Sequence, residues 1–160
     1  MVAPAADRQV NRARSRARRL ALQALYQWQL TGMEAAEIEG HFHERDEYAD
    51  ADADYFRELV LGVVARREEL DAHLAPHLDR TVEEVDPVER ALLRIGAYEL
   101  AVRADIPYRV VLNEAVELAR RFGAEQGHTY VNGVLDRVAR RLRGVEHPQG
   151  EGGGPVPGGR

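Results

Sequence analysis

Apolar residues recur at helical spacing along most of this 160-residue chain, and no stretch alternates in the way that a β-strand requires. Residues 11–30 are the clearest case, because a run of arginines there passes without a break into an amphipathic helix. At about 100° of rotation per residue, the apolar face of this helix carries Ala21, Ala24, Leu25 and Trp28. The opposite, polar face carries Arg12, Arg16, Arg19, Gln23 and Tyr26. Arg14 and Arg18 fall on the core side but precede the first large apolar residue, so we expect them to overhang the folded body.

The same period predicts further helices, at about residues 34–44, 55–74, 87–103, 106–122 and 128–142, and a short helix within residues 81–85. Capping signals precede four of these helices, namely Asp52 or Asp54, Thr81, Asp86 followed by Pro87, and Asp105 with Pro107. Gly123 follows the 106–122 helix as a C-terminal stop.

The 87–103 helix is apolar on most of its circumference, which places it in the middle of a bundle. We therefore predict an all-α fold, a bundle of about seven helices formed by residues 12–143. Residues 1–11 are expected to be a flexible N-terminus, and the glycine-rich residues 144–160 a disordered tail. Gly133, inside the last helix, suggests the close approach of another helix, and Asn132 at a buried edge is placed to bond a loop.

Positive charge is concentrated at one end of the chain. Six of the 22 basic residues lie within the first nineteen positions, opposed only by Asp7, so this segment carries a net charge of +5 and the remainder −10. Every basic residue is an arginine, whose guanidinium group suits phosphate. The pattern predicts that a polyanion binds there, and Gln23 and Tyr26 on the same face favour single-stranded RNA. A merely solvated helix start is less favoured, because positive charge opposes the helix dipole at an N-terminus.

Other chemistries are disfavoured by the sequence. The chain has no Cys, which removes disulfides and thiolate nucleophiles, and its longest apolar run, residues 59–65, is too short for a membrane span. We expect a soluble cytoplasmic protein. No phosphate loop, dinucleotide-binding motif or Ser-His-Asp signature is present, and the histidines lack carboxylates at ligand spacing, so no metal or cofactor is expected. Glu99, on an apolar stripe, is interpreted as half of a structural ion pair with Arg94 or Arg103.

Five segments give the chain a family resemblance: RRLALQALYQWQL at 18–30, YFRELVLGV at 55–63, VERALLRIGAYEL at 88–100, IPYRVVLNEAVELARRFG at 106–123 and FGAEQGHTYVNGVLD at 122–136. Over about residues 12–142 the chain resembles the NusB family of transcription antitermination factors. The resemblance implies two packed three-helix sub-bundles and a non-catalytic role. It further implies that the protein binds the boxA element of nascent ribosomal RNA as a heterodimer with NusE, a small-subunit ribosomal protein. This complex is expected to act on RNA polymerase together with other Nus factors.

The resemblance also assigns residues. It places the RNA-binding arm at Arg14, Arg16 and Arg18, with Tyr26 on the same helix, and continues the RNA surface at Arg109, Arg121, Thr129 and Tyr130. It places Glu89 on the surface that faces NusE. The chain departs from the family at three positions: Ser15 where an Arg is frequent, Thr129 where a Lys is common, and Gln126 where an acid is common.

Two other function classes stay open at this stage. Ribosomal RNA cytosine methyltransferases carry a domain of this kind at their N-terminus, but they need a large catalytic domain with a thiol nucleophile. A chain of 160 residues without Cys fits that class only as a fragment. The third possibility is a protein scaffold with incidental RNA binding, which would not prefer boxA to a scrambled RNA.

Overall fold

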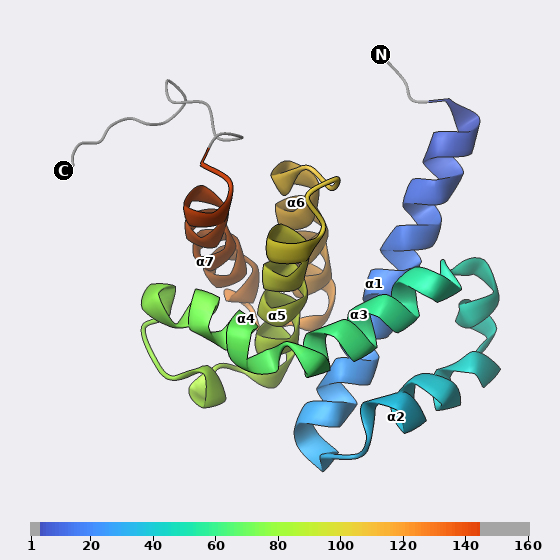
Figure 1. Ribbon diagram of the computed structural model, residues 1–160, viewed down its shortest axis with the longest axis horizontal. Coiled ribbons are helices and arrows are strands. Elements are labelled where there is room, and N and C mark those ends of the chain that lie inside the picture. Colours follow the sequence, from blue (N-terminus) through green and yellow to red (C-terminus); the bar gives the residue numbers. More distant parts are fainter. Residues whose placement is uncertain (1–3, 145–160) are drawn as a thin grey trace.

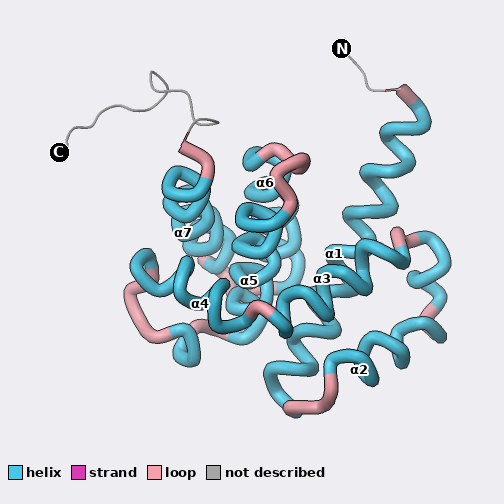
Figure 2. Tube along the Cα trace, in the orientation of Figure 1, coloured by secondary structure: helices cyan, strands magenta, loops and turns pink. Residues whose placement is uncertain are grey.

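The computed structural model describes residues 4–144, and residues 1–3 and 145–160 lie outside this description. The described part folds into seven α-helices, namely α1 (Ala5–Thr31), α2 (Ala35–His41), α3 (Ala53–Ala65), α4 (Arg67–Leu74), α5 (Pro87–Val102), α6 (Tyr108–Phe122) and α7 (Gly127–Leu142) (Figure 1). Short 3-10 helices lie in the connections, at Phe42–Glu44, Asp46–Asp50, Ala75–His77 and Val82–Glu84. Residues 4–144 contain no strand, which confirms the all-α prediction (Figure 2). Except for Gly144, the predicted disordered tail falls outside the described residues.

The helices form two three-helix sub-bundles, as the resemblance implied. α1, α2 and α3 pack against one another, and α5, α6 and α7 form the second group, with α4 lying against α5 and α7. α5 also contacts α1 and α3, so it joins the two groups. This confirms the central position predicted from its apolar circumference, and eleven of its sixteen residues are buried.

Capping side chains define three of the helix starts. Asp52 accepts a hydrogen bond from the backbone N–H of Tyr55 (3.0 Å) at the start of α3, and Asp86 accepts from the N–H groups of Val88 and Glu89 at the start of α5. Thr81 forms a reciprocal capping box with the short helix that follows it. The predicted cap by Asp105 is wrong, because α6 begins after Pro107 without a side-chain cap and Asp105 binds the guanidinium of Arg103 instead.

The single helix predicted at 55–74 is two helices in the structure. α3 ends at Ala65, Arg66 leaves the helical conformation (φ −107°, ψ 19°), and α4 begins at Arg67. The break has a tertiary cause, since α3 packs on α1 and α2 whereas α4 packs on α5 and α7. The chain therefore changes direction between sub-bundles although its apolar period continues.

A close helix approach occurs at a different glycine from the one predicted. A Cβ at Gly133 would meet only the guanidinium of Arg137, at 3.7 Å, so no helix crosses there. A Cβ at Gly96 would lie 2.5 Å from a methyl group of the fully buried Leu135, which shows that α5 and α7 pack closely at this point. Asn132 is exposed, and its predicted bond to a loop is not formed.

The N-terminal turns of α1 project beyond the body of the molecule (Figure 1). α1 begins at Ala5, so residues 5–11 of the predicted flexible N-terminus are helical, and all of them are exposed. Burial on α1 starts at Ala17. Within residues 4–144, no helix is long and apolar enough to cross a membrane.

Candidate nucleic-acid interface

The polar face predicted for α1 is present on the folded protein. Arg12 is exposed, Arg16, Arg19 and Gln23 are half-buried, and Tyr26 is 38% exposed although it is a large aromatic residue. The apolar face opposite is buried, with Ala21, Ala24 and Leu25 almost inaccessible. The helical period therefore assigned both faces of α1 correctly from Arg12 to Trp28.

A further arginine joins this face from a connection. Arg45 donates a hydrogen bond from Nη1 to the side-chain oxygen of Gln23 (2.7 Å), and its guanidinium lies 4.0 Å from the centre of the Phe42 ring. Arg45 is exposed, so it adds positive charge beside the middle of α1. Sequence reasoning missed it because it is 22 positions away from Gln23 along the chain.

The N-terminal part of α1 is bonded to the rest of the molecule near residues 13–15, just before its first buried residue. The backbone N–H of Asp52 donates to the carbonyl of Ala13 (3.0 Å), and the guanidinium of Arg14 lies 5.1 Å from the centre of the Tyr55 ring. Ser15, one of the departures from the family, donates its hydroxyl hydrogen to Glu114 (3.0 Å). Arg14 is 30% exposed in its side chain, so it lies at the edge between the arm and the core.

Arg18 does not overhang the body, contrary to the prediction from its position in the sequence, and its burial argues against an RNA contact. Its side chain is 4% exposed, and its Nε donates to Oε2 of Glu99 (2.7 Å). Its Nη1 lies 3.4 Å from Oε1 of Glu114. A guanidinium that is buried and engaged by two carboxylates is not available to a phosphate group.

The same pair corrects the predicted partner of Glu99. The sequence suggested Arg94 or Arg103, whereas Glu99, 1% exposed, binds Arg18 and also accepts a hydrogen bond from the hydroxyl group of Tyr55. Burial raises the pKa of Glu99, and the charge of Arg18 opposes this shift. Burial and the neighbouring Glu99 raise the pKa of Tyr55, so its hydroxyl stays protonated as a donor. The network joins α1, α3 and α5 across the two sub-bundles.

An apolar groove of about 390 Å³ lies at the C-terminal end of the polar face. It is lined by Leu22, Gln23, Tyr26, Gln27, Val88 and Phe122, which come from α1, α5 and the end of α6. Phe122 is 41% exposed, and the guanidinium of Arg121 lies 5.1 Å from the centre of its ring. The fold thus brings Tyr26, Gln23 and Arg121 together around an aromatic residue that sequence reasoning took only as a helix end. The available signal was a large apolar residue beside two arginines at the last turn of a helix.

The remaining arginine assigned to the RNA surface lies apart from this groove. Arg109 is exposed in the first turn of α6, with its guanidinium 5.3 Å from the centre of the Tyr108 ring. Twelve residues separate it from Arg121, which corresponds to about 18 Å along a helix. The two arginines therefore mark opposite ends of α6.

Thr129 and Tyr130 have different surroundings. Thr129 is exposed and lines a polar cavity of about 480 Å³ between α6 and α7, together with Arg120 and His128. Tyr130 is half-buried, donates its hydroxyl hydrogen to Asp79 (3.1 Å), and has the Arg80 guanidinium 5.0 Å from its ring centre. Hydrogen bonds from Arg80 and Tyr130 lower the pKa of Asp79 to about 2.

Glu89, predicted to lie on a protein-facing surface, is buried with 6% exposure, so its side chain offers a partner little area. Its carboxylate fills the space beside Gly127, where a Cβ would lie 2.0 Å from Oε2. That oxygen has no hydrogen-bond partner among the described residues, and burial raises the pKa of Glu89. Within residues 4–144, no group of three His, Cys, Asp or Glu side chains is placed to hold a metal ion.

Comparison with known proteins places most of the chain in one family. The model of the NusB family matches residues 15–140. The chain is 59% identical, over 133 residues, to the transcription antitermination protein NusB of Xylella fastidiosa (strain 9a5c), covering 83% of this chain and 85% of that protein. NusB of Xanthomonas axonopodis pv. citri (strain 306) is also 59% identical, with 83% and 84% covered.

Solved structures show the same fold. A structure of T. maritima NusB superposes with a TM-score of 0.70 at 30% identity and covers 82% of this chain and 95% of that one. A crystal structure of the antitermination factors NusB and NusE in complex with dsRNA has a TM-score of 0.72 at 29% identity, with 81% and 98% covered. The family match over most of the chain, the close relatives and the shared architecture lead to one conclusion: this chain belongs to the NusB family of transcription antitermination proteins.

Proposed function

We propose that this chain is an RNA-binding antitermination factor that binds the boxA element of nascent ribosomal RNA together with NusE. In this proposal it acts in the cytoplasm on RNA polymerase with other Nus factors, and it catalyses no reaction. The observation that carries the proposal is the polar face of α1, which runs from Arg12 through Arg16 and Arg19 to the aromatic groove at Tyr26 and Phe122.

The chemistry of this surface fits unpaired RNA. Guanidinium groups along α1 suit the phosphates, and exposed aromatic rings at the end of the row offer faces on which bases stack. In duplex RNA the bases are already stacked on each other, so Tyr26 and Phe122 would contribute nothing there. A related NusB was crystallised with NusE and dsRNA, which supports an RNA and a NusE partner for this family.

The decisive experiment measures the affinity of the full chain for a boxA RNA, a scrambled RNA and a duplex of the same length, with and without NusE, over a salt series. We expect boxA to bind most tightly and NusE to strengthen binding. Arg16→Glu should abolish binding while leaving the helix content unchanged. Arg140→Glu is the matched control, because it makes the same change of charge at an arginine that is exposed on α7 and outside the proposed RNA surface.

The aromatic groove has its own test. Phe122→Ala should weaken boxA binding about 5- to 150-fold, since base–aromatic stacking contributes about 1–3 kcal/mol. Leu30→Ala is the control, because Leu30 is also a large exposed apolar residue but lies outside the groove. Equal affinity for boxA and scrambled RNA would contradict the proposal and favour a scaffold role. Unchanged binding in Phe122→Ala would remove the groove from the RNA surface.

A further inference from the structure

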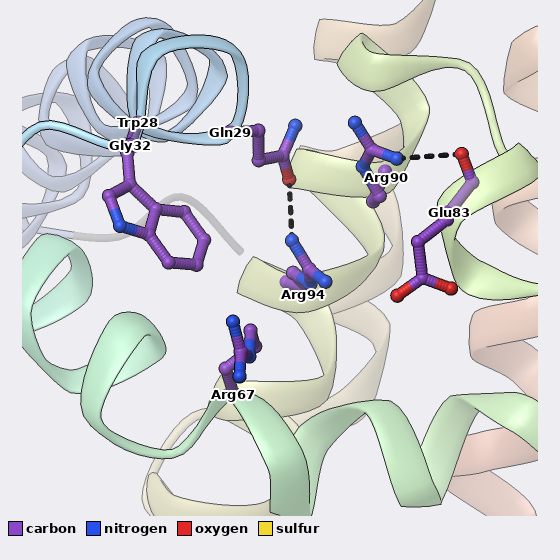
Figure 3. A pocket seen from close by; sticks show the side chains of 7 residues that line it. All are labelled: Trp28, Gln29, Gly32, Arg67, Glu83, Arg90 and Arg94. Carbon is purple, nitrogen blue, oxygen red and sulfur yellow. Dashed lines mark hydrogen bonds between the residues drawn. The ribbon is translucent and has the colours of Figure 1, made fainter.

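A second pocket, of about 410 Å³, lies where α1, α4 and α5 meet (Figure 3). It is lined by Trp28, Gln29, Gly32, Arg67, Glu83, Arg90 and Arg94. Trp28 follows Tyr26 by two residues, which is about 200° around the helix, so the pocket lies on the other side of α1 from the RNA-binding groove. It is therefore a separate site from the proposed boxA surface.

Three guanidinium groups line this pocket, and one of them is held rigidly. Arg94 donates from Nε and Nη2 to the two oxygens of Asp71 (2.9 Å each) and from Nη1 to Gln29 (3.0 Å). Its guanidinium carbon lies 5.7 Å from the centre of the Trp28 ring. Figure 3 shows Trp28, Arg67 and Arg94 projecting from three different helices toward one space.

The other two arginines retain unused donors. Arg90 donates from Nη1 to the carbonyl of Glu83 (2.9 Å), but its buried Nε has no hydrogen-bond partner among the described residues. Burial and the charge of Arg94 lower the pKa of Arg90, which reflects two crowded cations. Arg67 is exposed, and no hydrogen bond or ion pair joins it to another residue of the described part of the chain. The Nε of Arg90 is enclosed by protein, so a ligand in the pocket meets instead the exposed guanidinium of Arg67 and Nη2 of Arg90, which makes no hydrogen bond to a described residue.

The acidic residues around the pocket lie beside Arg90 and Arg94. Asp71 is occupied by Arg94, and the Glu83 side chain stands at the lining beside Arg90 (Figure 3). Asp86 also acts on Arg90, so three carboxylates accompany the three guanidiniums, and the attraction for an anion depends on the unpaired Arg67 and not on an excess of charge. The uncommitted donors belong to Arg67 and Arg90, whereas the rigid Arg94 is neutralised.

We propose that this pocket binds a nucleotide, with its phosphate group on Arg67 and Arg90 and its base against the indole ring of Trp28. Guanidinium forks match phosphate oxygens, and a flat aromatic ring beside them supplies a stacking surface that an acidic peptide would not need. A volume of about 410 Å³ is within the range of small-ligand sites. The nucleotide is either free or part of an RNA, and the experiment distinguishes these sources.

The pocket contains its own reporter, because Trp28 is the only tryptophan of the chain. We expect AMP and UMP to change the fluorescence of the full chain in a saturable way, with free tryptophan as the control for absorption by the nucleotide. Arg67→Ala should weaken this binding at least fivefold without changing the unfolding midpoint. Arg66→Ala is the matched control, because the adjacent arginine is exposed, paired with Glu69 and outside the pocket.

Three results would overturn the proposal. The first is the absence of a saturable fluorescence change with either nucleotide, and the second is equal binding by Arg67→Ala and the wild type. The third is that inorganic phosphate or a glutamate-rich peptide displaces AMP at the same concentration as UMP does. Two results support it and identify the source. If Arg67→Ala also weakens binding of a short RNA, the nucleotide belongs to RNA, and if RNA binding is unchanged, it is free. Arg16→Glu should retain AMP binding, so failure of the boxA proposal leaves this test intact.

Discussion

Replacing Arg18 with methionine is expected to destabilise the protein by about 3–5 kcal/mol at neutral pH, the cost of leaving a buried charge without its partner. Arg18 and Glu99 are 4% and 1% exposed in their side chains and are 2.7 Å apart, so neither is solvated by water in the folded state. After the substitution, Glu99 keeps only the hydroxyl group of Tyr55 as a side-chain donor. Glu114, also near Arg18, is 29% exposed and adds little to the loss.

The assay is urea unfolding followed by far-UV circular dichroism for the wild type, Arg18→Met, Glu99→Leu and the double variant. Removing both charges should recover most of the stability, because well-packed apolar side chains replace buried ion pairs at little cost. The reasoning is refuted if Arg18→Met loses less than about 1 kcal/mol at neutral pH, or if the double variant is no more stable than Arg18→Met.

The pH dependence gives a second, independent check on the same pair. Burial raises the pKa of Glu99 above its ordinary value of 4.5, and without Arg18 this pKa should rise further. An acid whose pKa is raised in the folded state stabilises the fold below its unfolded pKa and loses this contribution as pH rises through the folded value. The difference in free energy of unfolding between the wild type and Arg18→Met should therefore shrink as pH falls toward 4.5 and grow toward neutrality.

RNA binding gives a test of a different role for Arg18. If folded Arg18→Met binds RNA as weakly as Arg16→Glu, Arg18 is an RNA contact.

Four further substitutions test the packing and capping of the helices and the surroundings of Tyr130. Gly96→Ala should destabilise the protein by about 1–3 kcal/mol, because the added methyl group overpacks the contact with Leu135. Gly133→Ala should stabilise it by up to about 1 kcal/mol, because alanine has the higher helix propensity. Both are measured by urea unfolding, and similar effects of the two substitutions would contradict the close approach of α5 and α7 at Gly96. Tyr130→Phe should move the pKa of Asp79 upward from about 2 in an NMR titration, because a donor to the carboxylate is lost, and no change would mean that this bond is absent in solution. The lowered pKa of Asp79 favours the fold above its unfolded value of 3.8, and this contribution is lost as pH falls toward 2. Asp86→Ala should lower the free energy of unfolding by about 1 kcal/mol in urea, because α5 loses its N-terminal cap. The capping role is refuted if the loss is smaller than for an alanine substitution at an exposed aspartate that caps no helix.

Much of the fold was predictable because its signals are local. Asp86 with Pro87, and Thr81 with its capping box, act within one helical turn, and the structure has both. The helix-boundary predictions failed where another contact competed, a neighbouring ion pair in one case and tertiary packing in the other. Asp105 binds Arg103 instead of capping α6, and the 55–74 helix breaks at Arg66 because its two halves pack on different sub-bundles.

The candidate site divides in the same way. The helical period assigned Arg16, Gln23 and Tyr26 to one exposed face, since azimuth around a helix depends only on sequence separation. It also put Arg18 on the core side, yet whether a charge there is buried depends on a partner 81 residues away, which periodicity cannot identify. Phe122 acquires its place in the groove only because the end of α6 lies beside α1.

The sequence by itself determined an all-helical chain, most of the helix ends and the polar face of α1, because each follows from interactions within a few turns of one helix. Tertiary structure decided which charges were enclosed, which aromatic rings stayed exposed, and where arginines from different helices met around Trp28. The physical reason is that both the cost of burying a charge and the shape of a groove are set by side chains far apart in the chain, which are brought together only when the two sub-bundles pack.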